Sequence, residues 1–213
     1  MANITAVEAL QRLRDGNLRF VDDTRDQQQL ANASRRQAVA MAQEPFAIIL
    51  GCSDSRVPAE IVFDQGLGDL FVIRVAGNVV APSGIGSVEF AAARFGVRLV
   101  VVLGHSKCGA ISATLEELGR PSKDQSRNLR SIVDRIRPSI ETLLDTDLKN
   151  HPEELHHQAV RAHIRASVDH LRHGSDILEN LIQTDGLLVV GAEYSLETGL
   201  VEYITGVPDG VLK

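Results

Sequence analysis

Two cysteines and one histidine are spaced so that their side chains could bind one metal ion. The sequence of 213 residues contains two cysteines, Cys52 and Cys108, and His105 lies shortly before the second. Zinc binds cysteine sulfur and histidine nitrogen, and a zinc ion with three protein ligands keeps a fourth position open for water, as catalytic sites do. From these residues alone, two inert buried cysteines and a core histidine would be the ordinary alternative.

A charged pair follows the first cysteine in the segment Cys52-Ser53-Asp54-Ser55-Arg56. A partly buried carboxylate needs a partner, and an arginine can supply a bidentate one that keeps Asp54 ionised and oriented. The free carboxylate oxygen could then accept a hydrogen bond from a metal-bound water. The alternative for Asp54 and Arg56 is a surface salt bridge.

Short apolar runs predict the strands that position these residues. The runs 46–50, 70–73, 99–103 and 187–190 are continuous, which is typical of strands buried on both faces of a parallel sheet. Cys52 and His105 follow two of them, at the carboxyl edge where α/β sheets bind ligands. The segment 199–204 predicts an antiparallel edge strand. The fold class is therefore α/β, a mostly parallel sheet of four strands plus this edge strand, flanked by helices and preceded by an N-terminal helical arm.

Helical periodicity fills the segments between the strands. Thr5 and Glu8 form a capping-box pattern at the start of the first helix, and Ser175 can cap the last one. Pro138 is expected to interrupt the helix in which it lies. No repeat or low-complexity linker marks a boundary, so we expect one domain over residues 1–213. The remaining predicted helices cover residues 34–43, 86–95, 129–144, 152–172 and 175–183.

The composition excludes several classes of protein. The formal net charge is −6, with 44% hydrophobic and 23% charged residues, which is ordinary for a globular protein and unlike a nucleic-acid binder. No apolar run approaches the ~20 residues that span a bilayer, so no membrane partner is expected. The first residues lack a basic region followed by an apolar one, and a cytoplasmic location is expected.

The two motifs together resemble the signature of the beta-class carbonic anhydrases. The resemblance rests on Cys52-Ser53-Asp54-Ser55-Arg56 and His105-Ser106-Lys107-Cys108-Gly109, and it extends through residues 63–64, 71–78 and 86–90. It implies one Zn²⁺ per chain, held by Cys52, His105 and Cys108. It also implies reversible hydration of carbon dioxide to bicarbonate by zinc-bound hydroxide, with Asp54 and Arg56 as the catalytic dyad.

The resemblance implies a substrate pocket and an assembly as well. Gln43 falls where plant-like members place a substrate-binding glutamine that acts across the dimer interface. Phe71 matches an apolar pocket residue, Phe90 stands where tyrosine is frequent, and Gly109 offers a backbone amide near the zinc. A homodimer or a larger homo-oligomer is expected, with the N-terminal arm, residues 1–33, packing on a partner subunit.

One regulatory feature of the family is expected to be missing. A bicarbonate-regulated subgroup carries a Trp, Arg and Tyr trio beside the zinc. Arg74 and Tyr194 resemble two members of the trio, but Ile49 occupies the tryptophan position, and the chain has no tryptophan. We expect no regulation of this form.

Two other functions stay open at this point. A hydrolase of carbonyl sulfide or carbon disulfide could use the same scaffold, and a redox or zinc module could close Cys52 and Cys108 into a disulfide. His156, His163 and His170 recur every seven residues along a predicted helix, too far apart to share a metal ion, and a solvated helix face is expected. The segment Gly84-Ile85-Gly86 lacks the third glycine of a dinucleotide loop, so nucleotide binding is not expected.

Overall fold

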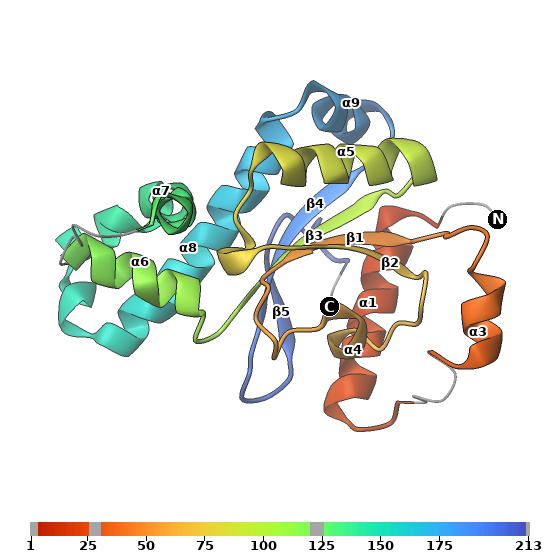
Figure 1. The fold of residues 1–213 in the computed structure, drawn as a ribbon, viewed down its shortest axis with the longest axis horizontal. Coiled ribbons are helices and arrows are strands. Elements are labelled where there is room, and N and C mark those ends of the chain that lie inside the picture. Colours follow the sequence, from red (N-terminus) through yellow and green to blue (C-terminus); the bar gives the residue numbers. More distant parts are fainter. Residues whose placement is uncertain (1–3, 26–30, 120–125, 212–213) are drawn as a thin grey trace.

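The protein is built on one five-stranded sheet with helices on both faces. A computed structural model describes residues 4–25, 31–119 and 126–211. The strand order is β2-β1-β3-β4-β5, with four parallel strands and an antiparallel edge strand (Figure 1). This confirms the predicted α/β class and the predicted edge strand. The strands are β1 (Ala47–Gly51), β2 (Leu70–Arg74), β3 (Leu99–His105), β4 (Leu188–Tyr194) and β5 (Val201–Thr205).

Strands β1 and β3 are apolar up to His105, the last residue of β3, because both of their faces are covered. Every residue of β1 and of β3 is buried. Side chains alternate between the faces, so Ile48 and Leu50 join one core cluster while Ala47 and Ile49 join the other. Polar side chains can therefore follow only where these strands end.

Helices of different origin cover the two faces. The N-terminal helix α1 (Ala6–Val21) and the short α4 (Ala59–Val62) contribute to one cluster, and α5 (Pro82–Phe95), α8 (Pro152–His173) and α9 (Asp176–Thr184) contribute to the other (Figure 1). Both clusters share the same sheet. The other helical segments are α3 (Ala33–Ala38), α6 (Gly109–Gly119), α7 (Arg127–Ile140) and the 3-10 helices η1 (Ala76–Asn78), η2 (Glu141–Asp145) and η3 (Asp147–Asn150).

The predicted caps are present. The Glu8 amide donates to the Thr5 hydroxyl at 3.2 Å, and the Thr5 amide donates to the Glu8 carboxylate at 2.8 Å, which completes the capping box. Ser175 caps α9 by accepting a hydrogen bond from the Leu178 amide. These caps satisfy amides that have no partner within the helix. Of the predicted arm 1–33, residues 1–3 and 26–30 lie outside the described residues.

Three predicted helix boundaries were wrong. The second helix was expected over 34–43 but covers only Ala33–Ala38. The helix expected from residue 86 begins at Pro82, because proline lacks only an amide that the first turn leaves unbonded anyway. Pro138 does not interrupt α7, which continues to Ile140. Pro138 lies in the last turn of α7, so the backbone hydrogen bond that a proline cannot donate is missing only near the end of the helix.

The expectation of a solvated face for the α8 histidines was also wrong in part. His170 is exposed and His156 is half-buried, but His163 is only 3% exposed. Its ring nitrogens lie 2.9 Å from the Gly77 carbonyl and 3.1 Å from the Ser139 hydroxyl. Burial lowers the pKa of His163 from 6.5 to about 4, against the opposing effect of the bond to Gly77, so the ring is neutral near pH 7.

Among the described residues, no helix is long and apolar enough to cross a membrane.

Gly16 should be essential for the packing of α1. A Cβ there would lie 1.9 Å from the Phe63 carbonyl oxygen, whereas a Cβ at Gly86, also within a helix, would have no described atom within 4 Å. Gly16→Ala should lower the free energy of unfolding by about 1–3 kcal/mol. Gly86→Ala should raise it by up to ~1 kcal/mol, because alanine favours helix. Urea unfolding followed by circular dichroism measures both, and equal effects of the two substitutions would contradict this packing.

Buried His163 should make the chain less stable in acid. Between pH 6.5 and about 4 the unfolded chain binds a proton at this residue and the folded chain does not, so the free energy of unfolding falls as pH falls. The loss should be about 2 kcal/mol between pH 7 and pH 5. Urea unfolding of chelator-treated protein at both pH values should show a smaller loss for His163→Gln than for the parent or for His170→Gln. Equal losses in all three proteins would refute the assignment.

Candidate metal centre

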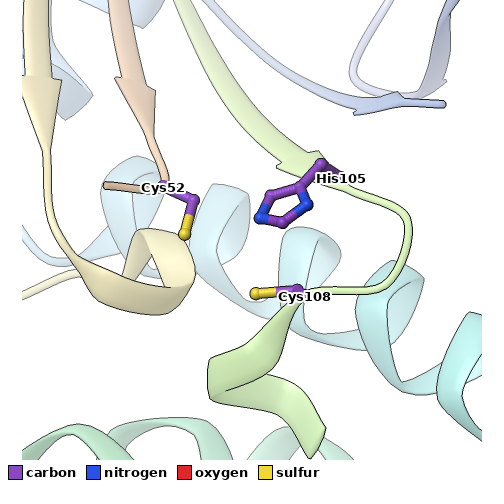
Figure 2. Close-up of side chains that lie close together, drawn as sticks. All are labelled: Cys52, His105 and Cys108. Atoms are coloured by element: carbon purple, nitrogen blue, oxygen red, sulfur yellow. The ribbon is translucent and has the colours of Figure 1, made fainter. Parts of the chain in front are cut away.

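The three predicted metal ligands meet at the carboxyl edge of the sheet. Cys52 directly follows β1, His105 ends β3, and Cys108 immediately precedes α6. Strands β1 and β3 are neighbours, with Gly51 opposite Leu103, so their ends lie side by side. The two sulfur atoms and the imidazole point toward one another (Figure 2). In the part of the chain that the structure describes, this is the one group of three such residues whose ligand atoms all lie within 4.8 Å of one another.

The chemistry of these donors fits zinc. All three side chains are buried. Nδ1 of His105 lies 2.8 Å from the Ser106 carbonyl oxygen, to which it donates, and this leaves the lone pair on Nε2. Nε2 is buried and has no hydrogen-bond partner among the described residues. A buried nitrogen of this kind beside two sulfurs is costly unless something binds it, and zinc accepts one nitrogen and two sulfur ligands in a single site.

The two thiols shift one another's pKa in opposite directions. A hydrogen bond from Cys108 lowers the pKa of Cys52 against the opposing effect of burial, and the Gly77 amide, 3.3 Å from the Cys52 sulfur, acts in the same direction. The same bond, together with burial, raises the pKa of Cys108. Because metal ions bind cysteine as the thiolate, a divalent cation would displace the remaining thiol protons as it binds.

Asp54 is held by Arg56 at the rim of this site. The Arg56 side chain donates to both carboxylate oxygens, at 2.9 and 2.7 Å, and its backbone amide donates to one of them at 3.0 Å. The side-chain bonds are the largest cause of the lowered pKa of Asp54, which stays ionised at neutral pH. Asp54 Oδ2 lies 3.8 Å from Nε2 of His105, so the carboxylate faces the metal ligands.

Arg74 holds the backbone of the first motif. Its guanidinium donates to the carbonyl oxygen of Cys52 at 3.1 Å and to that of Asp54 at 2.6 Å. The sequence singled out Arg74 only as part of a regulatory trio. The other two positions of the trio, Ile49 and Tyr194, are buried in the core cluster that α1 covers.

The second motif is held by a residue that sequence analysis missed. Glu197 accepts a hydrogen bond from Ser106 at 2.9 Å and lies 2.5 Å from the Lys107 ammonium group. The bond from Lys107 is the largest cause that lowers the pKa of Glu197 to about 2. Lys107 has a positive φ of 54°, an uncommon conformation that turns its carbonyl oxygen to within 3.4 Å of Arg56. No local pattern in the sequence connects Glu197 with this loop.

The residues expected to bind substrate fall into two groups. Gly109 begins α6, next to Cys108. Gln43 precedes β1, and Phe71 pairs with Ile48 near the start of β2, so both lie toward the opposite edge of the sheet from the metal ligands. The rings of Phe71 and Phe90 are 6.2 Å apart, and Phe90 is 54% exposed. Within one chain the structure does not bring these three residues to the metal site.

Comparisons with known proteins identify the family. A family model described as carbonic anhydrase matches residues 47–201. Carbonic anhydrase 2 of Mycobacterium tuberculosis is 38% identical over 93% of this chain and 93% of its own length. The crystal structure of a beta-carbonic anhydrase from Aspergillus fumigatus matches the fold with a TM-score of 0.73 at 23% identity, covering 96% of this chain and 93% of that one. The chain belongs to the beta-carbonic anhydrase family.

Other members agree with this assignment. A carbonic anhydrase of Mycolicibacterium smegmatis is 39% identical over 95% of both chains. The structure of a Coccomyxa beta-carbonic anhydrase has a TM-score of 0.70 at 24% identity, over 92% of this chain and 88% of that one. This carbonic anhydrase is thus an enzyme, a lyase.

The two cysteines are free in the structure, which disagrees with the disulfide-linked module considered from the sequence.

Proposed function

We propose that this carbonic anhydrase binds one zinc ion per chain through Cys52, His105 and Cys108 and uses it to hydrate carbon dioxide reversibly to bicarbonate. The observation that carries the proposal is the buried Nε2 of His105, which has no partner among the described residues and faces the two cysteine sulfurs. Zinc in this site would lower the pKa of a bound water from ~15.7 towards ~7 and so supply hydroxide at neutral pH.

Asp54 is proposed to orient the attacking water, and Arg56 to orient Asp54. An ionised carboxylate only accepts hydrogen bonds, so Asp54 would accept a hydrogen bond from the attacking oxygen and direct a lone pair of that oxygen at carbon dioxide. The bidentate contact from Arg56 removes the freedom of the carboxylate to turn away. Asp54 is the catalytic residue in this scheme, and Arg56 is a positioning residue.

We further propose that the substrate pocket forms between two copies of the chain. The metal ligands of the same chain lie away from Gln43, Phe71 and Phe90. Strand β1, which lies between Gln43 and Cys52, is by itself about 17 Å long, at ~3.3 Å per residue. The exposed ring of Phe90 offers apolar surface for a partner subunit. Gly109 would contribute its amide from the chain that holds the metal.

The shared sheet supports a single domain, and the separation of the site residues supports an oligomer. The two core clusters share one sheet, so residues 1–213 are proposed to form one domain. A homodimer or larger homo-oligomer would bring the two groups of site residues together, and the fold neighbours from Sordaria macrospora are described as tetrameric. Because the buried face of α1 packs on its own sheet, the N-terminal arm, residues 1–33, is proposed to contact the partner subunit through the exposed face of this helix.

Zinc content and turnover should depend on the same three residues. We expect one zinc per chain and carbon dioxide hydration that rises from pH 6.5 to 9, because two thiolates cancel the charge of the ion and leave its water less acidic. Cys108→Ser should lose the zinc, and its hydration rate should fall to the uncatalysed background. Metal analysis and stopped-flow assays of one preparation test this. Zinc-free active protein would refute the proposal, and zinc with turnover only of carbonyl sulfide would favour the hydrolase.

Loss of the Arg56 side chain should impair turnover without loss of metal. Arg56→Ala frees the Asp54 carboxylate, and the rate of hydration should fall by about 10- to 100-fold while zinc content stays the same. Arg56→Lys keeps the charge but not the bidentate contact, so its rate should lie between those of the parent and Arg56→Ala. Stopped-flow rates per bound zinc give the comparison. Full turnover by Arg56→Ala would contradict the proposed orientation of Asp54.

A further inference from the structure

Helix α8 carries two histidines that contact the backbone around both cysteine ligands. His156 and His163 are seven residues apart, close to two helical turns, and lie on one side of the helix. The helix packs against β3, β4, α6 and α7. It therefore lies behind the metal centre without contributing a ligand to it.

His163 acts on the turn that faces Cys52. Its Nε2 lies 2.9 Å from the Gly77 carbonyl oxygen, and the Gly77 amide donates to the Cys52 sulfur at 3.3 Å. Because a carbonyl only accepts, Nε2 carries the proton in this contact. Nδ1 lies 3.1 Å from the Ser139 hydroxyl, which itself donates to the Ile136 carbonyl oxygen at 2.6 Å.

Gly77 is closely packed on the side where a side chain would lie. Its φ of 66° is left-handed, and a Cβ would lie 2.9 Å from Ala110 on α6 and 2.9 Å from Ile136 on α7. The turn is thus enclosed by α6 and α7, and His163 bonds it from α8. The position of the amide that faces Cys52 follows from these three contacts.

His156 acts on the other cysteine directly. Its Nε2 lies 3.2 Å from the carbonyl oxygen of Cys108, which also accepts from the amide of Ser112 at 3.1 Å in the first turn of α6. The imidazole is half-buried and donates across the space between two helices. This bond connects Cys108, the residue that precedes α6, to α8.

We propose that His156 and His163 are positioning residues that hold the two cysteine sulfurs at the spacing required by the metal ion. The cysteines come from separate loops, after β1 and after β3. Helix α8 bonds Cys108 itself through His156, and through His163 it bonds Gly77 in η1, whose amide donates to the Cys52 sulfur, so one helix sets the separation of the two sulfurs. This inference rests on the proposed zinc site. Residues of this kind behind metal ligands change metal affinity by about 10- to 100-fold when removed.

Leucine and glutamine substitutions can separate this role from general support of the fold. His163→Leu and His156→Leu remove the donor at similar volume, whereas His163→Gln and His156→Gln can place an amide N–H near the Nε2 position. His170→Leu, on the same helix but exposed and without a hydrogen bond to a described residue, is the matched control. Each protein is purified at full length, and its affinity for Zn²⁺ is measured by competition with a chromophoric chelator. The absorption spectrum of the Co²⁺-substituted protein reports the ligand geometry.

We expect both leucine variants to bind Zn²⁺ about 10- to 100-fold more weakly than the parent and to shift the Co²⁺ absorption bands. The glutamine variants should recover most of the affinity, and His170→Leu should match the parent. Leucine variants with lower stability to urea but parental Zn²⁺ affinity and Co²⁺ spectrum would overturn the proposal. If His163→Leu does not fold, His156→Leu decides by the same readouts. A parent chain that binds no Zn²⁺ would instead refute the proposed function.

Discussion

The metal centre depends on one constraint, which is that two neighbouring parallel strands end at the same edge of the sheet. Strands β1 and β3 pair in register and are buried on both faces, so the first polar side chains after them emerge at the same edge. Cys52 and His105 are brought together by this geometry, although they are far apart in the sequence. Cys108 then joins them through a short turn into α6.

Electrostatics decide what the edge can bind. Burial disfavours thiolates, but hydrogen bonds from Cys108 and from the Gly77 amide lower the pKa of Cys52. Around this centre, Arg56 and Arg74 neutralise or bond the groups of the first loop, and Glu197 bonds those of the second. Each loop is therefore fixed by charges outside the site, which leaves the interior for soft donors and a metal ion.

The strands and the ligand set could be predicted because each depends on local pattern. A strand buried on both faces is a continuous apolar run, and the residues at its end follow in sequence. Glu197, Gly77 and the role of Arg74 could not be predicted, since each acts on a loop distant in sequence. Pro138 and His163 were predicted wrongly for a related reason. Periodicity gives the face of a helix, but tertiary packing decides whether that face is covered and where a proline can be tolerated.

The central claim is that the strand ends assemble one zinc site from two sulfurs and one nitrogen. X-ray absorption at the zinc edge of the purified protein tests it most directly. The account predicts two sulfur atoms at ~2.3 Å and two nitrogen or oxygen atoms at ~2.0–2.2 Å from the metal. Zinc surrounded only by nitrogen and oxygen atoms would contradict it, because Cys52 and Cys108 could not then be its ligands.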